Sequence, residues 1–266
     1  MLSCSKTSHL LAAACLLGCL LAFRPATETR ETRELPAFTS VRLGTRATVL
    51  VRQCNPQRVV VEAAPEDLPK LHTEVVNNQL RIYTEMTSTQ IGPIKFNPRT
   101  ATLTGPVMVY VTLPTVRGLA VSSSGRLLAD TLQAQNLTLS VSSSGRLLLG
   151  QLQAGSVRAG LSSSGHLAIS RLRADTLRAT LSSSGTITAA GVCTYSALGI
   201  SSSGHLNTQA LAVQDCRARI SSSGSCQVNV ARTLEAYLSS SGSVLVSGHP
   251  QITSHASGSG RVRLAQ

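Results

Sequence analysis

The sequence contains no tryptophan, and aromatic residues make up only 3% of its 266 positions. A compact core built around large rings is therefore not expected. Acidic residues are also few, with 12 Asp and Glu against 24 Lys and Arg, which gives a formal net charge of +12. Such an excess favours acidic partners. Nucleic acid is not expected among them, because the basic residues are dispersed and aromatic side chains for base stacking are scarce.

Cysteine usage excludes the common cysteine-based sites. Three of the seven cysteines lie within the first 19 residues, and the other four are Cys54, Cys193, Cys216 and Cys226. They form no Cys-x-x-Cys pair and no spacing typical of zinc. The pattern is also not that of a disulfide scaffold. We therefore predict no metal and no cofactor, and the redox state of the four cysteines stays open.

The N-terminus has the features of an export signal. Lys6 precedes an apolar run of 14 residues from Leu10 to Phe23, and a charged stretch, 24–34, follows it. That length suits a signal peptide better than a transmembrane helix. Leu16-Leu17-Gly18-Cys19 matches the bacterial lipobox, which makes Cys19 a candidate lipid attachment site. The alternatives are cleavage near Ala22 and an uncleaved anchor. We predict export to the cell envelope, with membrane contact only through this leader or a lipid on it.

A repeat dominates the rest of the chain. Ser-Ser-Ser-Gly occurs seven times, and consecutive copies are 20, 20, 20, 19, 20 and 18 residues apart. A degenerate eighth copy, Ser257-Gly258-Ser259-Gly260, follows after 18 more residues. A fixed period of this length with strand-like segments is typical of a solenoid. The repeat glycines are Gly125, Gly145, Gly165, Gly185, Gly204, Gly224 and Gly242.

Aligning the copies on the glycine gives columns of apolar residues on both sides. Apolar and polar residues alternate with a period of two, which is strand periodicity. Position +2 holds Leu127, Leu147, Leu167, Ile187, Leu206, Cys226, Val244 and Val262, and position −4 runs from Val121 to Ala256. Position +7 holds Leu132, Leu152, Leu172, Val192 and Leu211. We therefore predict an all-β, right-handed parallel β-helix of about eight coils of ~20 residues, with these columns inside.

The middle serine of each motif, such as Ser123 or Ser143, shares the inward parity. A buried hydroxyl needs a hydrogen-bond partner, and hydroxyls stacked from coil to coil can supply it. The alternative is that serine is simply a small residue that fits a tight corner with unusual backbone angles.

The segment before the repeat is less regular. Residues 38–43, 47–52, 58–63 and 107–113 read as strands, residues 65–71 as one helical turn, and Asn77-Asn78 as the turn of a hairpin. A solenoid end exposes a hydrophobic layer that needs covering. We divide the chain into a leader (1–23), a charged linker (24–34), an irregular N-terminal β cap with the first coils (35–118) and a regular solenoid (119–264).

These segments resemble a known family. Phe38-Thr39-Ser40-Val41, Leu68-Pro69-Lys70-Leu71, Leu80-Arg81-Ile82 and Val109-Tyr110-Val111-Thr112-Leu113-Pro114, together with the Ser-Ser-Ser-Gly repeat, are similar to the putative auto-transporter adhesin head domain, called head GIN. The resemblance covers roughly residues 35 to 264. It implies a cell-envelope protein with a parallel β-helical fold, and it brings no catalytic motif with it.

Catalysis is not expected from the residues themselves. After Gly118 the only acidic residues are Asp130, Asp175, Asp215 and Glu235, and they do not share a column on adjacent coils. β-Helix enzymes that act on polysaccharides need grouped carboxylates. We therefore predict a structural or adhesin-like protein and not an enzyme. The alternative is a carbohydrate-active β-helix enzyme, either a lyase or a hydrolase.

The remaining functional candidates are basic residues on the outside of the solenoid. Position +1 holds Arg126, Arg146, His166, His205 and Arg261, and a second outward column holds Arg158, Arg178 and Arg217. Such columns suit a repeating anionic polymer, so the predicted partner is an anionic surface polysaccharide or lipopolysaccharide. The simpler interpretation is that these arginines only solvate the rod. The sequence does not predict an oligomeric state.

Overall fold

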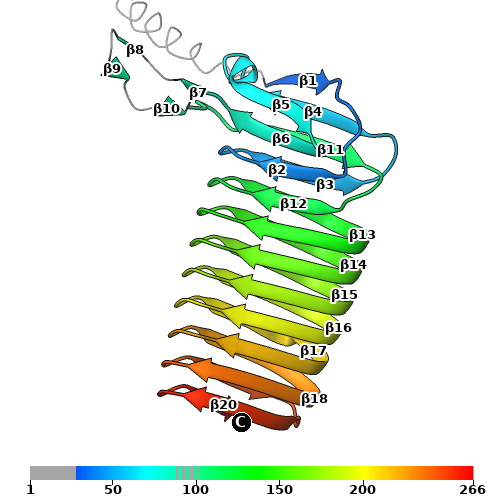
Figure 1. Ribbon diagram of the computed structural model, residues 1–266. Coiled ribbons are helices and arrows are strands. Elements are labelled where there is room, and N and C mark those ends of the chain that lie inside the picture. The colour runs from blue at the N-terminus through cyan, green and yellow to red at the C-terminus, as the bar shows by residue number, and fades with distance from the viewer. Residues whose placement is uncertain (1–27, 88–89, 92–93, 96–98, 101, 266) are drawn as a thin grey trace, which may run out of the picture.

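The computed structural model describes residues 28–87, 90–91, 94–95, 99–100 and 102–265. Within them the protein is a rod of stacked β-coils with a cap of shorter strands at one end (Figure 1). The leader, including Cys19, lies outside these residues. In the described part of the chain, no helix is long and apolar enough to cross a membrane.

The rod is a parallel β-solenoid in which each strand pairs with its copy one coil later. Leu127 pairs with Leu147, which pairs with Leu167, which pairs with Ile187. This confirms the all-β solenoid, with about seven turns rather than eight. Its strands are β12 (Gly118–Val121), β13 (Arg126–Val141), β14 (Arg146–Leu161), β15 (His166–Leu181), β16 (Thr186–Ile200), β17 (His205–Ile220), β18 (Ser225–Ser239), β19 (Ser243–Ser247), β20 (Gln251–Ser257) and β21 (Arg261–Leu264).

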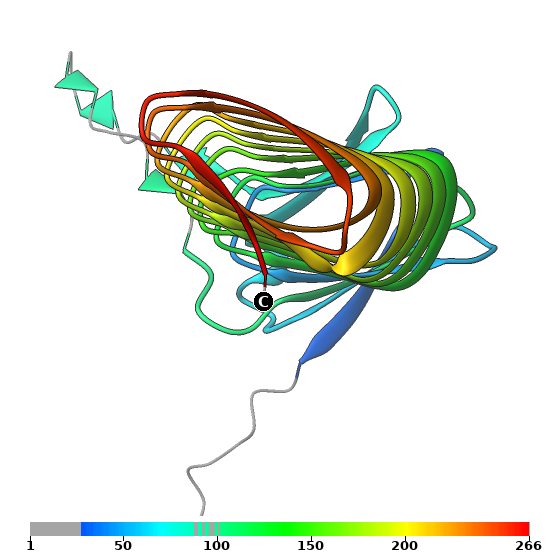
Figure 2. The ribbon, with the colours of Figure 1, turned by 90° about the horizontal axis from the view of Figure 1, so that it is seen from below.

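The interior consists of the apolar columns that the repeat predicts. Seen along the rod, the coils overlie one another around a shared interior (Figure 2). Leu127, Leu147 and Leu167 have no exposed surface, and the side chains at position −4 are buried from Val121 to Leu238. Each buried Leu or Ile contributes about 1.5–3 kcal/mol relative to an exposed one. In the last coil Ala256 is exposed and Val262 is only half-buried.

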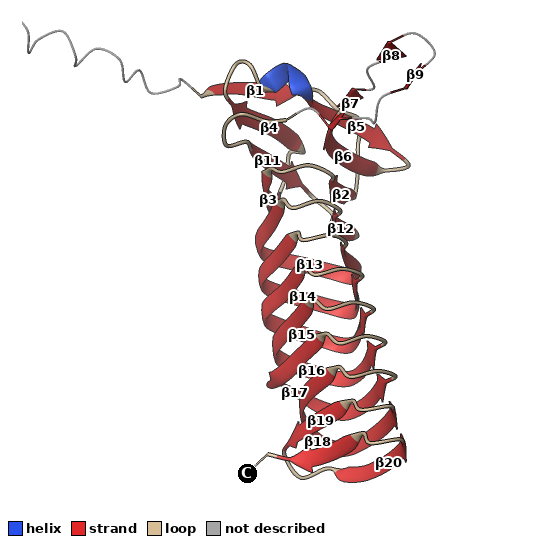
Figure 3. Ribbon diagram, turned by 90° about the vertical axis from the view of Figure 1, so that its left-hand side faces the viewer, coloured by secondary structure: helices blue, strands red, loops and turns tan. Residues whose placement is uncertain are grey.

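The Ser-Ser-Ser-Gly corners stack along one edge of the rod, as the loops in Figure 3 show. It is the glycine that faces inward there, because a Cβ at Gly145 would lie only 2.4 Å from Val121 Cγ1 and 2.5 Å from the Ser123 oxygen. The repeat glycines have no positive φ. Glycine is therefore needed here for the close approach of the preceding coil and not for an unusual backbone angle.

The middle serines are not buried, contrary to the parity argument. Ser143 and Ser240 are exposed, and the other five are half-buried. Ser143 and Ser240 also have positive φ, of 67° and 85°. Among the described residues no hydroxyl-to-hydroxyl bond joins one corner to the next, and Ser143 Oγ instead donates to the Ser122 carbonyl over 3.3 Å. Strand parity does not persist through the corner, so serine acts there as a small residue.

One coil departs from the repeat. The coil between Gly185 and Gly204 is a residue shorter, and its register shifts so that Gly191, not Val192, pairs with Leu172 and Leu211. Val192 is consequently 48% exposed, and its assignment to the interior was wrong. Gly191 has φ of +123°, and a Cβ there would lie 2.1 Å from the Leu172 oxygen, so only glycine fits.

The cap closes the N-terminal end of the rod by a change from parallel to antiparallel pairing. β1 (Thr29–Arg33), β4 (Arg58–Ala63) and β11 (Met108–Leu113) pair antiparallel in that order. β2 (Ser40–Leu43) and β3 (Thr48–Gln53) instead pair parallel with β12 and β13 and so begin the coils. The segment after the cap hairpin holds four two-residue strands: β7 (Met86–Thr87), β8 (Gln90–Ile91), β9 (Ile94–Lys95) and β10 (Arg99–Thr100).

The predicted hairpin and helical turn are both present. β5 (Leu71–Val76) and β6 (Gln79–Thr84) pair antiparallel, and Asn77 and Asn78 have φ of 51° and 60°. Two positive φ angles are the signature of the hairpin turn that matches strand twist. The helical turn is a 3₁₀ turn, η1 (Leu68–Lys70), which follows the fully buried Asp67.

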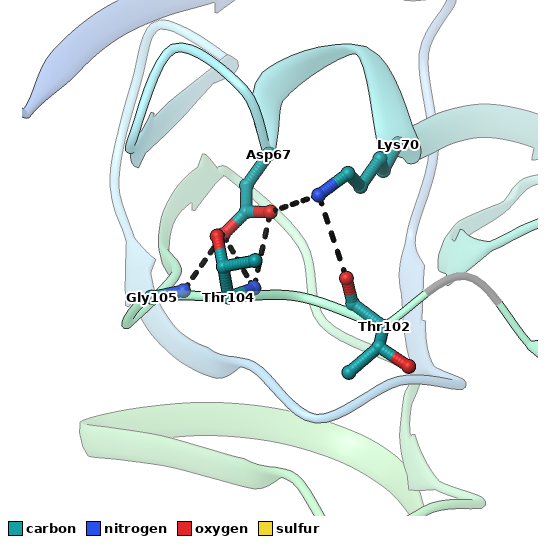
Figure 4. A network of polar contacts seen from close by, with 5 residues as sticks. All are labelled: Asp67, Lys70, Thr102, Thr104 and Gly105. Atoms are coloured by element: carbon teal, nitrogen blue, oxygen red, sulfur yellow. Dashed lines mark hydrogen bonds and ion pairs between the residues drawn. The ribbon is translucent and has the colours of Figure 1, made fainter.

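Asp67 joins this turn to the segment that enters β11 (Figure 4). Its carboxylate accepts hydrogen bonds from the Gly105 and Thr104 N–H groups over 2.8 Å and 2.9 Å and from the Thr104 hydroxyl over 3.0 Å. Lys70 Nζ lies 2.7 Å away. Burial would raise the pKa of Asp67, but the bonds from Gly105, Lys70 and Thr104 outweigh it and hold the pKa well below its usual range.

Candidate functional site

The structure brings together three of the five basic residues predicted at position +1. Arg126 pairs with Arg146, and Arg146 pairs with His166, so these three side chains stand on adjacent coils. We call them the basic column. With about 4.8 Å between coils, the column spans on the order of 10 Å.

The other two predicted residues lie apart from the basic column. Thr186 separates His166 from His205. Ser225 and Ser243 then separate His205 from Arg261. A polymer lying along this column would therefore meet consecutive basic residues only on β13, β14 and β15.

The basic column holds free positive charge. Arg126 and Arg146 are exposed, and neither forms an ion pair within the described residues. His166 is half-buried, and burial together with the neighbouring Arg146 lowers its pKa. It is therefore neutral at pH 7, and it becomes a third cation only in acid.

A strip of half-buried apolar side chains runs beside the basic column, two residues further along each strand. Leu50 pairs with Leu128, which pairs with Leu148, which pairs with Ala168. Tyr110 extends the strip into the cap, where it pairs with Leu50. This face of the rod thus offers cations and apolar surface side by side, as contacts to the charged groups and the C–H faces of one ligand require.

The second arginine column is only partly free. Arg158 and Arg178 are exposed and pair on adjacent coils. Arg217 is neutralised, because its Nε donates to Glu235 Oε2 over 2.6 Å. Glu235 occupies the same column as Arg217 one coil later, so this is an ion pair between neighbouring coils at the surface. Asp215 similarly binds Arg232. The unpaired arginines of the second column, Arg158 and Arg178, therefore lie on β14 and β15.

Groups that could support catalysis are sparse. In the described part of the chain, no three His, Cys, Asp or Glu side chains lie close enough together to hold a metal ion. One histidine contacts a hydroxyl, with His205 Nδ1 2.6 Å from Ser225 Oγ. Among the described hydrogen bonds and ion pairs, no carboxylate orients His205, so this contact lacks the third member of a hydrolytic triad.

The structure also has a groove that sequence reasoning missed. It occupies about 850 Å³ and runs along the bend of the coils, half a coil away from the Ser-Ser-Ser-Gly edge. We call it the bend groove. Its floor is the column Ala134, Ala154, Ala174, Cys193 and Val213, and polar side chains line both walls. The available signal was the recurrence of Gln-Ala at 133–134 and 153–154.

The cysteines lie where the columns place them. Cys226 is buried, as its place at position +2 predicts, Cys216 is buried as well, and Cys193 is buried on the groove floor. Burial raises the pKa of the Cys216 thiol to about 11. Cys54 is exposed, and all four described cysteines are free.

Comparison with protein families identifies the chain. The family model described as putative auto-transporter adhesin, head GIN domain, matches residues 37–250. The chain belongs to the head GIN family. No curated protein is similar to it in sequence.

Solved structures agree with the head GIN assignment. A putative lipid binding protein from Parabacteroides distasonis ATCC 8503 superposes with a TM-score of 0.81 at 18% identity, over 90% of this chain and 97% of that one. A putative adhesin from Parabacteroides merdae ATCC 43184 gives 0.81 at 16%, over 90% and 96%. A putative adhesin from Bacteroides fragilis NCTC 9343 gives 0.62 at 16%, over 90% and 97%. At these identities the likeness shows the fold alone.

The head GIN family is adhesin-like, and this carries over to the chain at a coarse level. The family indicates an exported envelope protein with a structural, adhesin-like role. Which molecule the rod contacts, and through which residues, is a separate question of local geometry.

Proposed function

We propose that this head GIN protein is a non-catalytic, adhesin-like rod that contacts an anionic surface polysaccharide through the basic column. The observation that supports it is the in-register pairing of Arg126 with Arg146 and of Arg146 with His166. A polymer with an acidic group on successive units meets cations at a matching repeat of about 4.8 Å. The apolar strip of Leu128 and Leu148 beside them offers surface for the less polar faces of the sugar rings.

Serine substitution tests the role of the arginines without changing the fold. Ser225 and Ser243 occupy the same column in later coils, so the rod accepts serine there. In the double variant Arg126→Ser/Arg146→Ser, binding to soluble polygalacturonate should weaken by about tenfold or more, because charge-assisted contacts are lost. Arg261→Ser is the matched control, since it removes one arginine from the same column outside the cluster.

Salt and pH provide a second readout. Binding should weaken as salt rises, because exposed charges are screened. It should strengthen as the pH falls through the lowered pKa of His166, since a third cation then joins the column. His166→Thr, which copies Thr186 of the same column, should abolish that pH dependence. Equal binding by the double variant and by Arg261→Ser would refute the proposal, and shortening of the polymer would establish a carbohydrate-active enzyme instead.

A lipopolysaccharide is the second candidate for the same face. It is favoured by the half-buried Leu50, Leu128 and Leu148 beside the arginines, and one relative in fold is titled a putative lipid binding protein. Intact and delipidated lipopolysaccharide distinguish the two ligands. If lipid is recognised, Leu148→Gln should weaken binding of the intact form only.

Export remains part of the proposal. We infer that the leader, residues 1–23, directs the rod to the envelope, and Cys19 is the proposed lipid attachment site. Palmitate labelling in the native host should mark the wild type and not Cys19→Ser. A mature, unlipidated chain that begins near Phe23 would show ordinary secretion, and full-length protein in the cytosol would end the export hypothesis.

A further inference from the structure

We propose that the bend groove is a second binding site, which takes an uncharged, hydroxyl-rich linear chain such as a neutral oligosaccharide. This site is distinct from the basic column in both position and chemistry. It does not depend on the contact with an anionic polymer proposed above.

The groove exists because side-chain alternation breaks at the bend. Two successive residues, Gln135 and Asn136, point outward there, and just before them the column of Ala134 faces inward between the outward columns of Gln133 and Gln135. Ala134 and Ala154 in that column are half-buried, and Ala174, Cys193 and Val213 are buried. Because the coils are in register, the depression continues from β13 to β17 and reaches Ala231 of β18. A repeat of about 4.8 Å gives it a length on the order of 25 Å, enough for several sugar rings.

The walls consist of side chains that both donate and accept hydrogen bonds. Gln133, Gln153 and Arg173 stack in register on one wall. Gln135, Asp175 and Gln214 line the other. Within the described residues, none of these six side chains forms a hydrogen bond or ion pair with another part of the protein. A chain of hydroxyl groups, each a donor and an acceptor, is complementary to such amide walls.

The net charge of the bend groove indicates a different kind of ligand from that of the basic column. Its lining includes one cation, Arg173, and one anion, Asp175, so the site is neutral overall. An acidic polymer would gain little attraction there and would meet the carboxylate of Asp175. An uncharged chain avoids that repulsion and uses the same donors and acceptors.

The two ends of the groove differ. At the cap end, the Gln53 side chain accepts from the Gln133 N–H over 2.7 Å and donates to the Gln133 carbonyl over 2.9 Å, which fixes the first coil. Further along, the register shift at Gly191 turns Val192 outward, and the same wall continues with Ala212. The wall therefore passes from amides to apolar groups, which suits a sugar chain whose hydroxyl edge lies on the glutamines and whose C–H face lies on Val192.

A side chain that fills the groove is the sharpest test. Ala212 is exposed on the groove wall, and Ala210 is exposed on the same strand outside the groove. Binding of the neutral hexasaccharides of glucose, mannose and xylose is measured by titration calorimetry for Ala212→Tyr and for its matched control Ala210→Tyr. Ala212→Tyr should weaken binding by at least about tenfold. Ala210→Tyr should bind as the wild type does, and both should melt at the wild-type temperature.

The result can be separated from the function of the basic column. Binding of the neutral hexasaccharide should not change with salt and should survive Arg126→Ser/Arg146→Ser. Polygalacturonate binding should in turn survive Ala212→Tyr. Gln153→Ala should weaken neutral binding by about threefold or more through the loss of one amide. Failure of all three hexasaccharides to bind, or unchanged binding in Ala212→Tyr, would overturn the inference and leave the basic column untouched.

Discussion

In the rod, Leu147 is covered by Leu127 on one side and by Leu167 on the other, and the same contact recurs from coil to coil. In the cap, Asp67 is held by Thr104 and Gly105, 37 and 38 residues away, and nothing else in the described chain repeats that arrangement. Both regions have a buried apolar core, but its contacts repeat between neighbouring coils in the rod, whereas the cap also depends on specific polar contacts such as those of Asp67. We therefore expect substitutions in the rod and in the cap to differ in their effect on stability.

The largest effect is expected from a charge inside the rod. Leu167→Asp places a carboxylate where the wild-type side chain has no exposed surface, at a cost on the order of 5 kcal/mol. Thermal melting should show loss of the folded rod. Arg146→Asp, one coil earlier and exposed, should melt close to the wild type. Similar melting temperatures for both variants would contradict the assignment of the columns.

The cap should depend on a single carboxylate. Asp67→Ala leaves the Thr104 and Gly105 N–H groups without their acceptor and should cost about 1–3 kcal/mol. Because the pKa of Asp67 is lowered in the folded state, its contribution is present above the unfolded pKa near 4 and is lost as the pH falls below it. Chemical denaturation at pH 7 and at pH 3 should therefore show a smaller difference between wild type and variant in acid. Asp130→Ala, an exposed position in the rod, is the control.

Two glycines of the rod differ in the space that is available for a side chain. A Cβ at Gly165 would lie 2.6 Å from Val141 Cγ1 and 2.7 Å from the Gly145 oxygen, whereas at Gly199 the nearest atom is 3.7 Å away. Gly165→Ala should cost about 1–3 kcal/mol through overpacking. Gly199→Ala should be neutral or stabilising by up to about 1 kcal/mol, since glycine weakens a strand interior. Denaturant midpoints compare the two, and equal values would mean that the corner can expand.

Thiol labelling gives the mildest test, because it leaves the sequence unchanged. Cys54, in the loop after β3, should react at once with a soluble maleimide. Cys216 and Cys226 should react only after denaturation, because they are buried and burial raises their thiol pKa values. Rapid reaction of all described cysteines in the native protein would contradict the inward columns.

The repeat made most of the rod predictable. Eight copies of one pattern identify which side chains face inward, because the same position is apolar each time, as with Leu127, Leu147 and Leu167. Assigning inward side chains by their distance from the glycine was wrong where a coil departs from the repeat. Val192 follows a one-residue deletion that shifts the register, and Ser143 lies in a corner where strand parity does not hold.

The repeat pattern does not predict contacts between distant segments or the shape of the surface. The contact of Asp67 with Gly105 joins segments with no common motif, so neither residue signals it locally. The sequence predicted five basic residues at position +1, but some coils carry no basic residue there. Thr186 follows His166 in this position, so only three of the five lie on adjacent coils. The bend groove arises from backbone direction at the bend, which a two-residue alternation does not describe.

The corner glycines also bear on how such a rod can change in evolution. Each corner fits against the coil before it, and a Cβ at Gly165, for example, would lie nearest to atoms of Val141, Ser143 and Gly145. Duplication or loss of one whole coil would join two corners of the same shape, so the fold tolerates changes in length of one repeat at a time. Both proposed binding surfaces run along the rod, so each such event would lengthen or shorten the ligand that they are proposed to accommodate by one step of about 4.8 Å. The repeat thereby acts as a unit of specificity as well as a unit of folding.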